Sequence, residues 1–120
     1  MKILYVEDEP ILRDEIAFVF EMEGYEVQTA EDGQMGWDVL QTYQPDIVVT
    51  DIKMPRLSGI GLLEKIRESQ FSQLPVIVMS GFASSDWVEQ AQALDIFAYI
   101  SKPFSLDDVL SQLGAAVASL

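Results

Sequence analysis

The chain has 120 residues, of which 49% are hydrophobic, and this fits one compact domain spanning residues 1–120 rather than a disordered chain. It contains no cysteine and no histidine, which excludes disulfides, thiolate or imidazole metal sites and histidine-dependent catalysis. Seven basic and twenty acidic residues give a net charge of −13, which disfavours direct binding to nucleic acid.

The opening residues, MKILYVEDE, turn acidic after too few apolar residues for a signal peptide or a membrane span. No other segment of the sequence is long and apolar enough to span a bilayer. We therefore expect a soluble, cytoplasmic protein that does not act at a membrane.

The predicted elements alternate between strands and helices. In chain order they are a strand at 3–6, a helix that begins at Pro10 and stops at Gly24, a strand at 26–29, a helix at 33–43, a strand at 47–50, a helix at 58–68, a strand at 76–79, a helix at 85–94, a strand at 97–100 and a last helix that begins with a capping pattern at Ser105. All strands except 26–29 are nearly continuous apolar runs, which is typical of strands covered on both faces. This (βα)5 order predicts an α/β fold with a doubly wound, five-stranded parallel sheet, although the pattern alone leaves the strand order open.

Apolar spacing also predicts which side chains are buried. For the first helix we expect one buried stripe, formed by Ile11, Leu12, Ile16, Val19 and Phe20. Trp87 and Phe97 lie at core spacing in their elements, so we expect both in the core rather than at an interface.

Polar side chains stand where four of the five predicted strands end. Glu7 and Asp8 follow the first strand, Asp51 the third, Ser80 the fourth and Lys102 the fifth. In an open parallel sheet, ligands bind at the carboxyl ends of the strands, near the point where the strand order reverses. Three carboxylates converging there would repel one another unless a cation lay among them, and hard oxygen ligands of this kind suit Mg²⁺.

Asp51 has the chemistry of a nucleophile toward phosphorus, which would give an aspartyl phosphate. Such a site needs a metal on one phosphoryl oxygen, a cation on another and a hydroxyl on a third. Glu7 and Asp8 would hold the metal, Lys102 would be the cation and Ser80 the hydroxyl donor. Each of these residues alone has a simpler explanation as a turn, cap or loop residue, but their coincidence at one sheet edge favours a site.

Four motifs in order resemble the receiver domain of two-component response regulators, of the chemotaxis-regulator kind. These are the acidic pair in VEDE, the segment DIKMPRLSG from Asp51 to Gly59, the hydroxyl in VMSG and the K-P-F element in YISKPF. The resemblance covers essentially the whole chain. It implies a flavodoxin-like sheet with strand order 2-1-3-4-5.

The resemblance also implies specific roles for single residues. Asp51 would be the phosphoacceptor, with Mg²⁺ held by Glu7, Asp8, Asp51 and the backbone carbonyl of Lys53. Ser80 and Lys102 would contact the phosphoryl group, and Ser80 would reorient together with Tyr99 as a switch pair. The side chains of Lys53 and Phe82 would influence the phosphoryl lifetime, and a cis peptide bond is common before the proline at Pro103.

The function implied is phosphorelay signalling without conventional enzymatic turnover. A sensor histidine kinase or a histidine phosphotransfer protein would be the donor. A surface formed by the fourth helix, the fifth strand and the fifth helix would then act on a downstream protein or a tethered output domain. A stand-alone regulator and a receiver cut from a longer protein both remain open, as does phosphorylation-dependent dimerisation.

Two other classes fit the residues less well. A Mg²⁺-dependent phosphohydrolase with an aspartyl nucleophile typically has a second aspartate two residues on, where this chain has Lys53. A flavin-binding module would need a glycine- and hydroxyl-rich phosphate loop after the first strand, where this chain has Glu7, Asp8 and Glu9. Those acids would repel a phosphate in the absence of a metal.

Overall fold

The structure, a computed structural model, describes residues 1–81 and 85–120. Its elements are β1 (Lys2–Val6), α1 (Pro10–Met22), β2 (Glu26–Ala30), α2 (Gly33–Tyr43), β3 (Ile47–Thr50), α3 (Gly59–Arg67), β4 (Val76–Ser80), α4 (Ser85–Ala93), β5 (Ala98–Ser101) and α5 (Leu106–Ala118). Phe82, expected to influence the phosphoryl lifetime, lies outside the described residues. None of the described helices is long and apolar enough to cross a lipid bilayer.

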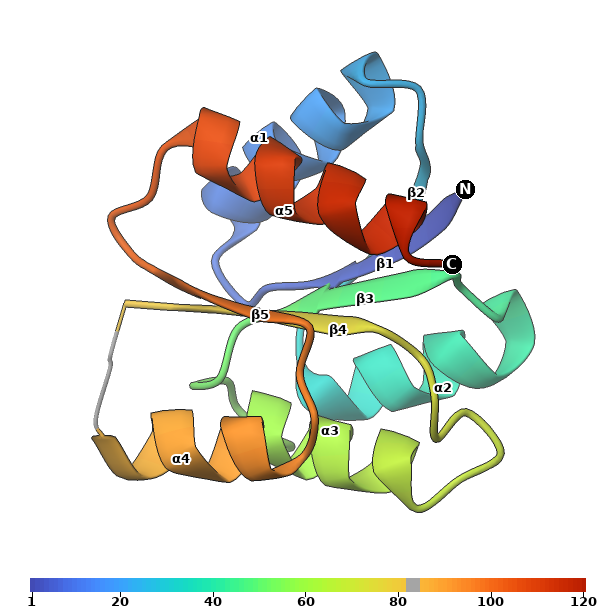
Figure 1. The fold of residues 1–120 in the computed structure, drawn as a ribbon, viewed down its shortest axis with the longest axis vertical. Coiled ribbons are helices and arrows are strands. Elements are labelled where there is room, and N and C mark those ends of the chain that lie inside the picture. The colour runs from blue at the N-terminus through green and yellow to red at the C-terminus, as the bar shows by residue number, and fades with distance from the viewer. Residues whose placement is uncertain (82–84) are drawn as a thin grey trace.

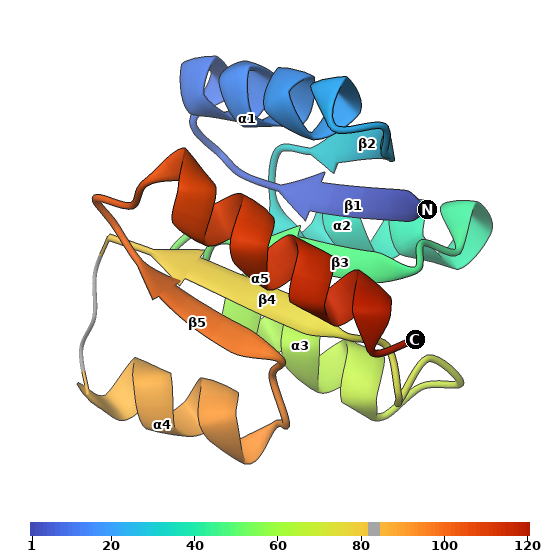
Figure 2. The same ribbon diagram turned by 45° about the horizontal axis from the view of Figure 1, so that its top comes forward.

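The five strands form one parallel sheet in the order β2-β1-β3-β4-β5, which confirms the predicted fold (Figure 2). The order reverses between β1 and β3, which pair side by side although β2 lies between them in the sequence. Their register sets Val6 beside Thr50, so the residues that follow, Glu7 and Asp51, leave the sheet next to each other.

Helices cover both faces of the sheet: α1 and α5 lie on one face, and α2, α3 and α4 lie on the other (Figure 1). The alternation of side chains along each strand divides the core accordingly. In β1, Ile3 and Tyr5 belong to the cluster under α1 and α5, whereas Leu4 and Val6 belong to the cluster under the other three helices. Because both faces of the sheet are covered, a one-residue slip of a strand would move its core side chains to the wrong face, and this specifies the register.

Two core expectations are wrong. Ile11 is 71% exposed, because at about 100° per residue it lies on the opposite side of α1 from the buried Phe20. Phe97 is 37% exposed, because it precedes β5 instead of belonging to it. Trp87 is partly buried and packs against the core, as expected.

Candidate functional site

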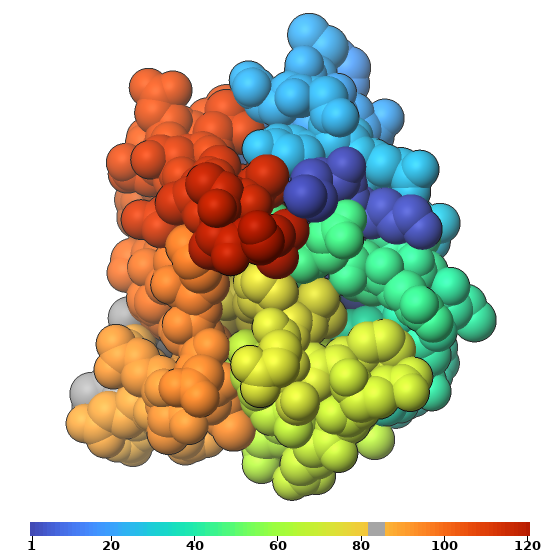
Figure 3. All heavy atoms as spheres, turned by 45° about the vertical axis from the view of Figure 1, so that its right-hand side comes forward, coloured from blue at the N-terminus to red at the C-terminus, as the bar shows by residue number. Residues whose placement is uncertain are grey.

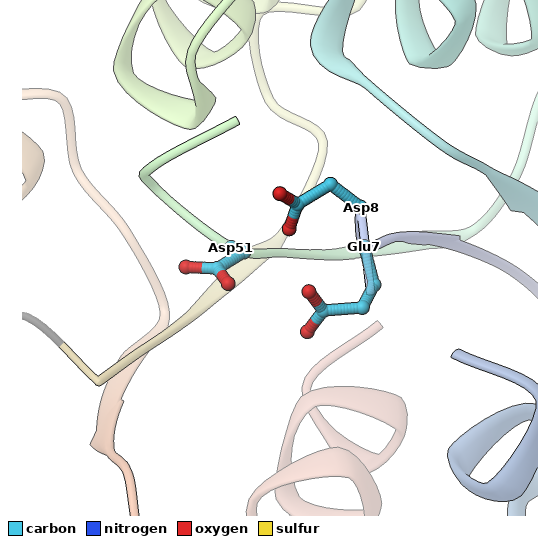
Figure 4. Close-up of side chains that lie close together, drawn as sticks. All are labelled: Glu7, Asp8 and Asp51. Carbon is cyan, nitrogen blue, oxygen red and sulfur yellow. The ribbon is translucent and has the colours of Figure 1, made fainter. Parts of the chain in front are cut away.

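The acidic side chains predicted to cluster are brought together at the carboxyl ends of β1 and β3. Ligand oxygens of Glu7, Asp8 and Asp51 all lie within 4.8 Å of one another, and their carboxylates point into the same space (Figure 4). The backbone fixes this arrangement, since the N–H of Asp51 donates to the carbonyl of Val6 at 3.1 Å. Glu7 is 1% and Asp51 8% exposed, whereas Asp8 is exposed to solvent.

Lys102 reaches this cluster from the far end of the chain. Its Nζ donates to Glu7 Oε1 at 2.9 Å and to Asp51 Oδ2 at 2.9 Å. The backbone N–H of Lys102 donates to the carbonyl of Ser80 at 2.8 Å, which ties the start of this loop to the end of β4. The peptide bond between Lys102 and Pro103 is cis, as the resemblance implies.

Burial and charge act together on the ionisation of this cluster. Burial raises the pKa of Glu7, and the hydrogen bond from Lys102 offsets this only in part. Burial by itself lowers the pKa of Lys102, but its hydrogen bonds to Asp51 and Glu7 outweigh that effect and raise it. The ammonium group is therefore held charged between two carboxylates.

Contacts with neighbouring residues hold Asp51 in place. Its Oδ1 accepts the N–H of Ile52 at 2.7 Å, and its carbonyl accepts the hydroxyl of Thr50 at 2.9 Å. Gly59, at the start of α3, approaches so closely that a Cβ there would collide with the Asp51 carbonyl oxygen. These contacts orient the Asp51 carboxylate toward Lys102 and the acidic cluster.

The other predicted site residues lie in β4, β5 and the loop after β3. Ser80 ends β4 with 1% exposure, opposite Ser101 of β5. Lys53 lies in the loop after β3, and its side chain is on the surface. Tyr99 lies in β5 with its hydroxyl buried, and among the described residues that hydroxyl has no hydrogen-bond partner.

The donor set matches the chemistry of Mg²⁺. The cluster offers only carboxylate oxygens, which are hard ligands, and one of its carboxylates is open to solvent where waters or a phosphate would complete the shell. A divalent cation would also offset the repulsion between Asp8 and Asp51, which Lys102 does not relieve for Asp8.

Sequence reasoning missed two residues that touch Glu7. The Tyr5 hydroxyl donates to Glu7 Oε1 at 3.4 Å, and the Arg13 guanidinium donates to the Glu7 carbonyl at 3.0 Å. Tyr5 has the one hydroxyl in an otherwise aliphatic strand, and residues two apart point to the same side of a strand. This spacing is the feature of the sequence that could have predicted its contact with Glu7. Nothing in the spacing of Arg13 predicts that its side chain folds back onto the strand end.

A profile of the response regulator receiver domain matches residues 3–114. The transcriptional regulatory protein PdtaR of Mycobacterium tuberculosis is 36% identical over 117 residues, which cover 97% of this chain and 56% of PdtaR. The regulatory protein AtoC of Escherichia coli is 32% identical over 108 residues, which cover 90% of this chain and 23% of AtoC. The chain thus spans less than two thirds of the length of either relative.

Solved structures share the whole fold. The crystal structure of a response regulator receiver domain protein from Clostridium thermocellum has a TM-score of 0.91 at 31% identity, covering 98% of this chain and 94% of that chain. A CheY-like receiver domain protein from Methanospirillum hungatei has a TM-score of 0.93 at 28% identity, with the same coverage. Since the family profile extends over nearly its entire length, the chain belongs to the response regulator receiver domains of two-component systems.

Proposed function

We propose that residues 1–120 form a single receiver domain that accepts a phosphoryl group on Asp51 and passes a conformational signal to a partner. The observation that carries this proposal is the placement of Lys102 Nζ 2.9 Å from Asp51, beside the carboxylates of Glu7 and Asp8. The domain is a cytoplasmic signalling module, and its only chemistry is the transfer to and loss from Asp51.

The phosphoryl donor is a phosphohistidine on a sensor kinase or phosphotransfer protein. A carboxylate oxygen of Asp51 forms a bond to phosphorus while the phosphorus–nitrogen bond breaks, and the histidine leaves as neutral imidazole after taking up a proton. Glu7, Asp8, Asp51 and the carbonyl of Lys53 would hold Mg²⁺, which would neutralise charge on the phosphoryl oxygens. Lys102 and the Ser80 hydroxyl bind the remaining oxygens.

An exposed apolar stripe on α1 supports a protein donor. Ile11, Phe18 and Met22 are 71%, 64% and 72% exposed and recur at helical spacing along one face. The stripe begins at Ile11 in the first turn of α1, three residues after Asp8, and we infer that a donor docked on it would present its phosphohistidine to the acidic cluster. Exposed apolar surface of this kind is typical of interaction sites.

The response surface is formed by α4, β5 and α5. New contacts from the phosphoryl group to Ser80 and Lys102 shift β4 and β5, and Tyr99 changes position with Ser80. The buried hydroxyl of Tyr99 supports this step, because a hydroxyl without a partner in its described surroundings favours a second orientation in which it is hydrogen-bonded. A downstream protein or a tethered output domain reads the altered surface, without direct contact to nucleic acid.

The test is incubation with acetyl phosphate and Mg²⁺, followed by intact mass measurement, beside an Asp51→Asn control. We expect a metal-dependent gain of one phosphoryl group in the wild type and none in the variant. Phosphoramidate, which has a phosphorus–nitrogen bond, provides a second donor closer to phosphohistidine. No gain from either donor, in folded protein that binds Mg²⁺, would contradict the proposed chemistry for small donors and leave a binding module.

A further inference from the structure

The loop between β3 and α3 contains a turn of unfavourable geometry. Arg56 has φ of 69°, a region that side chains with a Cβ rarely adopt, and the N–H of Leu57 donates back to the carbonyl of Pro55 at 2.8 Å. This is the hydrogen bond of a γ-turn with positive φ, which is rare and strained. Such a turn persists only where surrounding contacts hold it in place.

Asp32 supplies one such contact from the neighbouring loop. Its carboxylate is buried, with 3% of the residue exposed, and its two oxygens have separate partners. Oδ1 accepts the N–H of Met35 at 2.8 Å and so caps the start of α2, while Oδ2 lies 3.3 Å from Nη1 of Arg56. One carboxylate therefore starts a helix and holds the turn at the same time.

The backbone makes a second contact between the same two segments. The N–H of Gly33 donates to the carbonyl of Leu57 at 3.0 Å. A Cβ on Gly33 would collide with that carbonyl oxygen, so the approach requires glycine. Two consecutive residues of each segment thus meet, and the loop that follows Asp51 is attached to the start of α2.

We propose that the Asp32–Arg56 pair positions residues 53–57 of the loop between β3 and α3, which we call the metal-binding loop. It holds the turn three residues beyond Lys53, so that the Lys53 carbonyl is already directed toward the acidic cluster before a metal binds. This inference rests on the proposed function, because it takes that carbonyl as a ligand of Mg²⁺. Neither Asp32 nor Arg56 is among the residues proposed to hold the metal or the phosphoryl group, so both are positioning residues.

The ion pair adds little to overall stability, because its cation, the Arg56 side chain, is 61% exposed and screened by solvent. The expected effect is therefore on metal affinity and on local order of the loop. Holding a ligand in its bound geometry raises affinity by removing the cost of ordering it during binding.

The decisive variant is Arg56→Asn, with Mg²⁺ binding measured by calorimetry. Asparagine tolerates positive φ, so the variant removes the cation and leaves the turn possible. Loss of a cation makes the protein more negative, and through the electric field alone it would tighten Mg²⁺ binding. We expect the opposite, a loss of about three- to tenfold, at or below the low end of the range for residues that support metal ligands.

Two matched variants control for charge. Lys65→Gln removes one positive charge from the surface of α3, where Lys65 lies over the ring of Trp37, and we expect Mg²⁺ affinity unchanged or slightly higher. Arg56→Lys keeps the charge, and we expect it to restore at least half of the lost affinity.

Asp32→Asn keeps an oxygen to cap α2 and loses the charged partner, so combining it with Arg56→Asn should weaken binding no further than Arg56→Asn alone.

A second readout needs no metal. Amide hydrogen exchange of Gly33 in the metal-free protein reports its bond to Leu57, and we expect faster exchange in Arg56→Asn than in Lys65→Gln. Wild-type affinity and exchange in Arg56→Asn would overturn the inference, and so would faster exchange with unchanged affinity. Failure of the wild-type protein to bind Mg²⁺ would overturn the proposed function and this inference together, which separates the two failures.

Discussion

At the scale of single residues, two glycines that both lie in helices have opposite surroundings. A Cβ at Gly59 would collide with the carbonyl of Asp51, whereas a Cβ at Gly114 in α5 would meet nothing within 4 Å. We expect Gly59→Ala to lower the free energy of unfolding by about 1–3 kcal/mol, as overpacking does. Gly114→Ala should raise it by about 0.5–1 kcal/mol, because alanine has the higher helix propensity.

Urea unfolding of both variants provides the measurement. Phosphorylation by acetyl phosphate adds a second one, because a shift at Gly59 displaces Asp51 while a change at Gly114 does not touch the site. Equal stability changes of the same sign at the two positions would show that the close approach of Gly59 to Asp51 is unimportant.

Glu7 makes the stability of the metal-free protein depend on pH. Burial raises its pKa above the ordinary value of 4.5, and Lys102 offsets this only in part. Between the ordinary and the raised pKa the folded state binds more protons at this group than the unfolded state, so its contribution to the free energy of unfolding falls as pH rises. We expect the stability of Glu7→Gln relative to wild type to increase from pH 4.5 upward and to level off above the raised pKa.

Urea unfolding with a chelator across this pH range measures the difference between the two proteins, which removes the contribution of the other acids. Saturating Mg²⁺ is the control, because a cation that binds only the folded protein stabilises it. We expect that stabilisation to be larger in the wild type than in Glu7→Gln. A stability difference between the two proteins that is constant with pH would show that Glu7 ionises normally in the folded state.

At the scale of elements, Arg67 joins three segments at the amino ends of the strands. Its guanidinium donates to the carbonyls of Leu94 and Leu74, both at 2.7 Å, and to those of Ser72 and Asp95, both at 3.1 Å. These contacts connect the end of α3 to the loop before β4 and to the loop before β5. In Figure 3 the yellow-green and orange segments that contain these two loops adjoin on the face in view.

We expect Arg67→Lys to lower the free energy of unfolding by about 1–3 kcal/mol. A lysine ammonium cannot direct donors to four carbonyls at once as the planar guanidinium does, so two or more carbonyls lose their protein partner and bind water instead. Each lost hydrogen bond costs about 0.5–1.5 kcal/mol. Urea unfolding measures the loss. Lys65→Gln on the same helix is the control and should change stability by less than about 0.5 kcal/mol. An equal loss in the two variants would show that the four carbonyl contacts of Arg67 do not stabilise the fold.

The elements themselves were predictable because their patterns are local. Ser58 and Ser105 each cap a helix, because each hydroxyl accepts the backbone N–H of the residue three positions later. The capping pattern that begins at Ser105 predicts the second of these caps. Ile11 shows the limit: its apolar character predicts a place in the buried stripe of α1, but its side chain lies on the exposed side of the helix. Hydrophobicity predicts that a residue prefers burial, but the helix geometry decides which side is covered.

At the scale of the whole molecule, the convergence of Glu7, Asp8, Asp51 and Lys102 could be predicted, because a parallel sheet brings strand ends to one edge. The bridging of Glu7 by Lys102 was not predicted, since the pair is 95 residues apart and depends on side-chain geometry. The contact of Asp32 with Arg56 was missed for the same reason. Sequence patterns indicate which edge holds the site, whereas the contacts between loops come only from the assembled fold.

We expect phosphorylation of Asp51 to change the conformation of the surface formed by α4, β5 and α5. The path is short, because the Lys102 N–H is bonded to Ser80 at the end of β4, and Ser80 pairs with Ser101 of β5. We expect amide chemical shifts of residues 85–110 to change when acetyl phosphate is added to the Mg²⁺-bound protein, and to stay constant in Asp51→Asn. Residues 39–43 at the end of α2, away from the contact of its first turn with the loop after Asp51, should change little. Shift changes confined to the loops around Asp51 would contradict a coupled switch, because the direct effect of the added charge is screened within about 8 Å in physiological salt.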